Sequence, residues 1–374
     1  MAPRVIGVLR HFLPGYLSTR PILTPAQWRA IRAITHCRTP ALGGHRYACV
    51  PCGQKAFAFH SCNHKACPQC GREATREWVE RELAKRIQAP YFMVTFTLPA
   101  QLREVFFRPH AKIAYDTFFA AAAAALQDCL LKAKWLGAAR SGFTAILHTW
   151  NQQLHFHPHL HVIVPAAGLD ANGNVLIGKN DTFLLPVPAL QAAFRRHFRA
   201  RLKARDWQVD PAVWHTDWGI HIQPFGAGTA AIKYLGAYVC RTAIGDHRIL
   251  HADTHSVTFL WKDRAQGNRG KTMTLPGAEF VRRYLRHVLP PKMHATRYYG
   301  FSHPAAKATR QRIAFHSGRP LVIGPTPPAQ PREPLGVPRC PCCCQPMTQV
   351  ASFKPHRWFV PWPERRSPIR KAPT

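Results

Sequence analysis

The stretch His155-Phe-His-Pro-His-Leu-His-Val-Ile-Val-Pro165 alternates histidine with other residues and ends in an aliphatic run. In an extended chain, side chains two apart share a face, so the histidines would lie opposite Leu160, Val162 and Val164. Pro158 cannot donate to a neighbouring strand, and the strand is predicted to begin there. His159 and His161 are then the best-placed pair. Two imidazoles on a sheet can hold a divalent ion such as Mg²⁺ or Mn²⁺, with water and phosphate oxygens completing the shell.

A histidine pair of this kind is a weak signal alone. With 22 histidines in 374 residues, about one His-x-His is expected by chance. A second motif, Tyr234-Leu-Gly-Ala-Tyr238, adds to it. Tyrosines four apart lie on one face of a helix, although core aromatic residues use the same spacing. Gly236 between them is a poor helix former, which a purely structural helix would not favour.

The chain is strongly basic and long enough for two or three domains of about 100–200 residues. It has 51 Lys+Arg against 18 Asp+Glu, a net charge of +33. Such a surface repels itself unless a polyanion binds it, which favours nucleic acid over the alternative of an anionic membrane. The longest apolar stretch, residues 118–126, is well below the roughly 20 residues that span a bilayer. Arg4 and Arg10 interrupt the apolar N-terminus, unlike a signal peptide, so a cytoplasmic protein is predicted.

Most of the twelve cysteines fall in two clusters, six between residues 37 and 70 and four between 340 and 344. In a reducing compartment such clusters favour metal over disulfides. Two C-x-x-C pairs, 14 residues apart, have the spacing with which four thiolates hold one Zn²⁺ tetrahedrally. Four further residues could form a second tetrahedral site. The expected ligands are Cys49, Cys52, Cys67 and Cys70 in the first site, and Cys37, His45, Cys62 and His64 in the second.

Both zinc sites are expected to be structural, because a full set of protein ligands leaves no position for water or substrate. Isolated cysteines are often buried hydrophobic side chains, which is the interpretation of Cys129 and Cys240. Cys340 and Cys343 form another C-x-x-C. No second pair lies near them in the sequence, so no metal site is predicted in the tail.

Local patterns predict an α+β fold. Thr24 is the predicted N-cap of a helix that begins at Pro25 and ends near Thr35. A basic helix around Arg195–Arg205 is expected to contact DNA phosphates. From about residue 318 prolines accumulate, so the tail is predicted to be extended and poorly packed. Further helices are predicted at 110–134, 188–204, 228–242 and 278–289, and strands at 91–98, 145–150, 160–164, 219–223 and 257–261.

Together, the motifs and the charge predict a metal-dependent tyrosine nuclease. Tyrosine, with a pKa near 10, is a weak nucleophile at neutral pH. A metal ion that polarises the phosphate makes attack by Tyr234 or Tyr238 feasible. The expected products are a 5′-phosphotyrosine and a free 3′-hydroxyl. Since the phosphodiester is exchanged, rejoining needs no ATP, and the sequence contains no G-x-x-x-x-G-K-[ST] motif.

These motifs resemble those of the IS91 family transposases, which belong to the HUH endonuclease superfamily and are associated with rolling-circle transposition. The likeness covers most of the chain. The family usually has His where this chain has Ala66, so His64 would have to substitute in the second zinc site. The likeness rests on Cys37-Arg-Thr-Pro-Ala-Leu-Gly-Gly-His45, Ser61-Cys62, Cys67-Pro-Gln-Cys70, Phe96-Thr-Leu-Pro99, His159-Leu-His161, Lys233-Tyr-Leu-Gly-Ala-Tyr238 with Arg241, Trp261-Lys-Asp263 and Met273-Thr-Leu275.

The resemblance implies a zinc-binding, DNA-binding module over residues 1–88, an HUH catalytic domain over 89–317 and a Pro-rich basic tail over 318–374. The catalytic domain would have a central antiparallel sheet flanked by helices, with the histidines on a middle strand and the tyrosines on a neighbouring helix. The third metal ligand varies in such enzymes, and the candidates here are His157 and Gln223.

The implied partner is DNA, as single-stranded or hairpin ends of the protein's own element, in a bacterial, nucleoid-associated setting. Lys233 and Arg241 are expected to bind it. The oligomeric state and the order in which the tyrosines act stay open. Three alternatives also stay open: a plasmid replication initiator or relaxase with the same chemistry, a zinc-dependent DNA-binding protein without catalysis, and an RNA-binding protein, since basic zinc knuckles also bind RNA.

Overall fold

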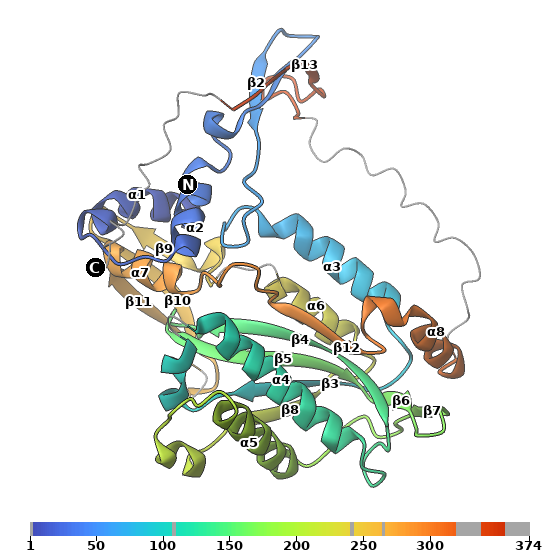
Figure 1. The fold of residues 1–374 in the computed structure, drawn as a ribbon. Coiled ribbons are helices and arrows are strands. Elements are labelled where there is room, and N and C mark those ends of the chain that lie inside the picture. Colours follow the sequence, from blue (N-terminus) through green and yellow to red (C-terminus); the bar gives the residue numbers. More distant parts are fainter. Residues whose placement is uncertain (1–2, 107–109, 240–242, 264–265, 319–337, 356–374) are drawn as a thin grey trace, which may run out of the picture.

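The computed structural model describes residues 3–106, 110–239, 243–263, 266–318 and 338–355. They form an α+β fold with a central antiparallel sheet flanked by helices, as predicted (Figure 1). A second sheet packs with the N-terminal helices, and a three-stranded ribbon projects at one end of the molecule (Figure 1).

The central sheet has seven strands, in the order β7-β6-β4-β5-β3-β8, and β12 also pairs with β4. Every pair is antiparallel. β5, the strand with the histidines, therefore lies in the middle of the sheet, between β4 and β3. The strands are β3 (Tyr91–Thr97), β4 (Arg140–Trp150), β5 (Phe156–Pro165), β6 (Ala167–Leu169), β7 (Val175–Ile177), β8 (Ile220–Pro224) and β12 (Thr296–Gly300).

Each face of this sheet is covered by helices. α4 (Ala111–Leu130) and α5 (Val187–Lys203) bury a large aromatic core against one face. α3 (Gly71–Lys85) and α6 (Thr229–Val239) pack against the other, where α8 (Lys307–His316) adds Ile313 to the same cluster. The fully buried aromatic residues of the first core are Phe92, Phe96, Phe118, Phe119, Phe194, Phe198 and Trp218.

A second core joins the N-terminus to a later part of the chain. α1 (Val5–Ser18) packs on α7 (Gly277–Arg286), and a Cβ at Gly277 would overlap the Phe12 ring, so only glycine permits this approach. The sheet beneath has the order β11-β10-β9. α2 (Pro25–His36) begins after Thr24, the predicted N-cap, which forms a capping box with Gln27. The strands are β9 (Ile249–Ala252), β10 (Ser256–Asp263) and β11 (Arg269–Pro276).

The projecting ribbon joins two segments that are far apart in the sequence. β1 (Gly44–Ala48) pairs with β2 (Lys55–Phe59) and also with β13 (Thr348–Phe353). The prediction of an extended, poorly packed tail is therefore wrong for residues 338–355, while 319–337 and 356–374 lie outside the described residues. The prediction failed because it rested on the number of prolines in the tail and not on their positions. The prolines flank β13 and none lies within it, so the backbone of β13 can pair along its whole length.

The predicted helices and strands are confirmed in the described residues, with shifts at some ends, and residues 240–242 of the predicted helix lie outside the described residues. β4 begins at Arg140, earlier than the predicted residue 145. β5 begins at Phe156 and continues through Pro158, which was predicted to be its first residue. The ladder with β4 shifts register between His148 and Trp150. Pro158 falls at this irregularity, where the ladder does not need the N–H that proline lacks.

Candidate active site and cysteine clusters

Three histidines meet on one face of the central sheet. His159 and His161 alternate along β5, and His148 on β4 lies opposite His159 in the ladder. The ring centroids of His148 and His161, and those of His159 and His161, are 4.9 Å apart. One ring nitrogen from each histidine lies within 4.8 Å of the others. This spacing suits three imidazole ligands around one ion.

Hydrogen bonds orient the two β5 rings. His159 Nδ1 lies 2.8 Å from the His157 carbonyl oxygen. A carbonyl only accepts, so Nδ1 carries the proton and Nε2 carries the lone pair that can bind a metal. His161 Nδ1 lies 3.0 Å from the Thr95 hydroxyl on β3. The neighbouring strand thus holds the second ring in place.

His148 is the residue that the sequence reasoning missed. Its side chain is 3% exposed, and burial, followed by the proximity of His161 and His159, lowers its pKa well below the usual value. The ring is therefore neutral at physiological pH, the form that binds metal. The sequence pattern could have identified it. Strand alternation puts the polar His148 on the same face as Ile146 and Trp150 in a predicted buried strand, where a polar side chain indicates a specific role.

Neither candidate for the third ligand belongs to this group of three, although the ring of His157 is 5.3 Å from that of His159. His157 Nδ1 accepts a hydrogen bond of 3.0 Å from Arg103 Nη2. Nε2 of a neutral His157 then carries the proton and cannot bind a metal. Gln223 lies on β8, separated from β5 by β3, and its register position is level with Met93 and Ile163. In place of both, the structure brings His148 to the pair.

The tyrosine helix covers the sheet face that carries the histidines. Alternation along β5 places Ile163 on the same face as His159 and His161. Ile163 is buried with Ile232 of α6, whereas Leu160 is buried with residues of α4 and α5 on the opposite face. The candidate metal ligands and α6 therefore share one side of the sheet.

Tyr234 on α6 has a side chain that is 38% exposed, with its ring 6.2 Å from that of Phe225. Lys233 beside it is exposed as well. The side chain of Tyr238 and the whole of Arg241 lie outside the described residues. α5, with most of the basic run expected to bind DNA, packs on the opposite face of the sheet.

Gly236 has a packing role. A Cβ at this position would overlap Cγ2 of Val79 on α3 and would approach Trp78. Glycine lets the two helices come close together. The interpretation that a structural helix would not favour glycine here is therefore corrected: the glycine serves the contact between α3 and α6.

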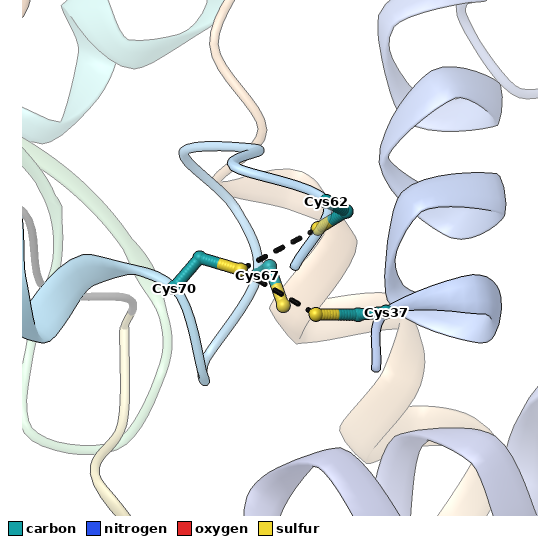
Figure 2. A group of neighbouring side chains, drawn as sticks. All are labelled: Cys37, Cys62, Cys67 and Cys70. Atoms are coloured by element: carbon teal, nitrogen blue, oxygen red, sulfur yellow. Dashed lines mark hydrogen bonds between the residues drawn. The ribbon is translucent and has the colours of Figure 1, made fainter. Parts of the chain in front are cut away.

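The first cysteine cluster joins three segments. Cys37 ends α2, Cys70 precedes α3, and Cys62 and Cys67 lie in the loop between β2 and α3. Figure 2 shows the four side chains turned toward one another. The Sγ atoms of Cys37 and Cys70 are 3.4 Å apart, and those of Cys62 and Cys70 are 3.6 Å apart. These separations approach the edge of a tetrahedral zinc tetrathiolate, about 3.8 Å for Zn–S bonds of about 2.3 Å.

The predicted grouping of the two N-terminal C-x-x-C pairs around a single ion is wrong. Cys67 and Cys70 join Cys37 and Cys62, whereas Cys49 and Cys52 join a pair from the tail. The spacing was compatible with one site, but β1 and β2 carry Cys49 and Cys52 away along the ribbon (Figure 1). The expectation that the tail cysteines belong to no site is also corrected, because Cys340 and Cys343 meet this N-terminal pair.

The histidines expected at the second zinc site lie outside both clusters. His45 Nε2 is 3.1 Å from His60 Nε2, and its Nδ1 is 2.9 Å from the Ser352 hydroxyl. His64 Nδ1 accepts a hydrogen bond from the backbone N–H of Ala66. Each of the two candidate zinc sites consists of four cysteines. Neither site therefore needs the histidine that the family usually has at the position of Ala66.

Known proteins resemble this chain over most of its length. Residues 142–310 match a family model described as a putative transposase, and residues 8–98 match the transposase zinc-binding domain. The chain is 36% identical over 320 residues to the putative transposase y4qJ of Sinorhizobium fredii, covering 80% of each chain. It is 27% identical over 313 residues to the transposase for insertion sequence element IS801 of Pseudomonas savastanoi pv. phaseolicola, covering 78% of this chain and 74% of that protein.

No solved structure matches the chain significantly. None of the helices in the described ranges has the length and apolar character needed to cross a membrane. The first matched region contains the three histidines and α6, and the second contains the whole of the first cysteine cluster.

Proposed function

The chain belongs to the IS91 family of transposases, and we propose that it nicks and rejoins single-stranded DNA at the ends of its own element through a 5′-phosphotyrosine. The observation that carries this proposal is the shared face of the central sheet. The histidines and the helix with Tyr234 and Tyr238 come from separate parts of the chain, yet they lie on the same side.

His148, His159 and His161 are the residues that would hold a catalytic Mg²⁺ or Mn²⁺. The donor set fits a divalent ion: three imidazoles close together leave positions for water and phosphate oxygens. When bound, such an ion polarises the scissile phosphate and offsets the charge that develops on it.

The protein's own chemistry is a transesterification. A tyrosine Oη attacks the phosphorus, and the bond from phosphorus to the 3′ oxygen breaks. The tyrosine loses its proton, and the leaving oxygen gains one to become a free 3′-hydroxyl. The phosphate stays esterified to tyrosine, so attack by a 3′-hydroxyl reverses the step without ATP. Two tyrosines would let one hold the first strand while the other makes the next cut.

The first cysteine cluster supports a second part of the proposal, a structural Zn²⁺ held by Cys37, Cys62, Cys67 and Cys70. This ion would tie the end of α2 to the start of α3, the helix on which α6 packs. The Tyr284 hydroxyl donates to the Ala66 carbonyl at 2.7 Å, which anchors the same loop to α7. Zinc would thus position the element that supports the tyrosine helix.

A cleavage assay tests the function. Single-stranded oligonucleotides with the DNA that flanks the gene, labelled on either side of the cut, are incubated with protein and Mn²⁺ and separated under denaturing conditions. The label 3′ of the cut should become covalently attached to protein, and the other fragment should end in a 3′-hydroxyl. Tyr234→Phe with Tyr238→Phe should abolish the adduct and leave DNA binding nearly intact, whereas Tyr47→Phe on the ribbon should retain it. An adduct that persists in the double variant would refute the tyrosine assignment.

A further inference from the structure

Four thiols from segments far apart in the sequence meet at the far end of the ribbon, beside the turn between β1 and β2 (Figure 1). Cys49 and Cys52 lie in the turn between β1 and β2, and Cys340 and Cys343 precede β13. Sγ of Cys49 is 3.3 Å from that of Cys343, although 294 positions separate them in the chain. Sγ of Cys52 is 3.4 Å from that of Cys340 and 3.7 Å from that of Cys343. These values approach the edge of about 3.8 Å for a tetrahedral zinc tetrathiolate.

The two turns have the same backbone geometry. In the first, the Cys49 N–H donates to the Gln54 carbonyl and the Gly53 N–H donates to the Cys49 carbonyl, both at 2.8 Å. In the second, the Cys340 N–H donates to the Gln345 carbonyl at 2.8 Å. The N–H of Cys344 donates to the Cys340 carbonyl at 2.9 Å. Both turns therefore use bonds between the same relative positions.

The residue after the second cysteine is left-handed in both turns. Gly53 has a φ of +70°, which glycine adopts freely, and Cys344 has a φ of +58°. An L residue adopts this conformation at a cost. The tail nevertheless takes the form of the N-terminal turn, and this form places two thiols side by side. A chance approach of two loops would not require such a match.

Only two of the four tail cysteines, Cys340 and Cys343, belong to the cluster. Cys340 is buried, while Cys342 and Cys344 are exposed and do not belong to the cluster. The selected pair has the spacing of a C-x-x-C, the same as Cys49 and Cys52. If the cysteines had come together only because they are numerous, Cys342 or Cys344 could equally have been in the cluster. The shape of the turn therefore determines which two thiols face the N-terminal pair.

We propose that Cys49, Cys52, Cys340 and Cys343 bind a second structural Zn²⁺, which fastens residues 338–355 to the N-terminal ribbon. Four thiolates in tetrahedral reach favour zinc, and a full ligand set leaves no open position for catalysis. The region matched by the zinc-binding family model ends at residue 98, so half of this ligand set comes from outside it.

The ion accounts for the attachment of β13 to β1. Apart from the cysteines, the buried cluster here contains Met347, with Tyr47 and Ala56 packed against it. Phe353 of β13 also contacts Phe57 and Phe59 of β2. These few apolar side chains contribute little against the entropy of ordering the tail segment. Four metal–sulfur bonds add to them, because binding energy at a structural zinc site is folding energy. Removal of the ion should release the tail strand.

Elemental analysis of the full chain, purified under reducing conditions, tests the proposal. The wild-type protein should contain two zinc ions per chain. Cys340→Ser with Cys343→Ser should contain one, and the matched control Cys342→Ser with Cys344→Ser should contain two. The ion that remains in the first variant, at Cys37, Cys62, Cys67 and Cys70, shows that the rest of the module has folded.

Hydrogen–deuterium exchange gives the second readout. Amides of residues 348–353 should exchange about tenfold faster or more in the Cys340/Cys343 variant, and at the wild-type rate in the control. Two zinc ions in the Cys340/Cys343 variant, unchanged exchange in it, or disulfides in place of metal in the wild-type protein would overturn the proposal. Neither readout involves DNA, so the result is independent of the proposed nuclease activity.

Discussion

His148 on β4 and His159 on β5 face each other across the ladder, with ring centroids 5.3 Å apart. The candidate metal site is therefore shared by two strands. Cross-strand neighbours are held by the backbone ladder on both sides, so the ligands are positioned before any ion binds.

Replacement of His148 with Ala should lower the rate of single-turnover cleavage at least about 100-fold, as much as His159→Ala does. In either variant only two of the three imidazoles remain, and the ion is held less tightly. His157→Ala is the control, since His157 orients His159 through its backbone carbonyl, and its loss should cost about tenfold or less. Thermal unfolding of each variant checks the fold. Cleavage by His148→Ala at the wild-type rate would exclude His148 as a ligand.

Mn²⁺ should support cleavage at a concentration about tenfold or more below that needed for Mg²⁺, because imidazole nitrogen suits Mn²⁺ better than the strongly oxygen-preferring Mg²⁺. A titration of each metal against cleavage rate measures the two midpoints. In His148→Gln, an amide oxygen replaces one nitrogen, and the difference between the midpoints should narrow. Equal midpoints in the wild-type protein would argue against a site with three imidazoles.

Gly236→Ala should destabilise the protein. The added Cβ overlaps Val79, and overpacking of this kind costs about 1–3 kcal/mol. The helix propensity of alanine regains at most about 1 kcal/mol. Val79→Ala in the same chain should restore the free energy of unfolding, measured by chemical denaturation. If Gly236→Ala were instead more stable than the wild type, helix propensity would dominate and the close approach of α3 and α6 would be wrong.

Lys233→Gln should weaken the binding of single-stranded DNA and reduce the slope of log affinity against log salt by about 1, as expected for the loss of one phosphate contact. Lys179→Gln is the matched control: Lys179 is also exposed but follows β7, the strand at one edge of the sheet. Its slope should equal that of the wild type, and an equal loss there would refute a specific contact at Lys233. Lys203→Gln, on α5, tests the contact expected of the basic helix: a reduced slope would mean that DNA also follows the α5 face.

Single-stranded element ends should be cleaved much faster than the same sequence as a blunt, relaxed duplex. A phosphate must reach the tyrosine helix and the histidines together, and a single strand bends at less cost than a stiff duplex. Cleavage rates on both forms at matched salt measure this. Equal rates would show that strand opening is not required.

The sequence by itself determined the local features of this protein. The period-2 pattern of residues 159–164 predicted a buried strand, and the capping box at Thr24 predicted the start of α2. The pair His159 and His161 followed from the same pattern, because two residues on one strand share a face whatever the strand packs against. The C-x-x-C spacings likewise indicated turns that present two thiols to a metal.

Only the tertiary structure decided which of these pieces meet. The register between β4 and β5 brought His148 to the histidine pair, and the docking of α6 on α3 gave Gly236 its role. The pairing of β1 with β13 joined Cys49 and Cys52 to thiols almost 300 positions away. Local periodicity fixes the face on which a side chain lies, but it contains no information about the segment that packs against that face. That choice depends on register and on the burial of apolar surface between distant segments, which are properties of the whole fold.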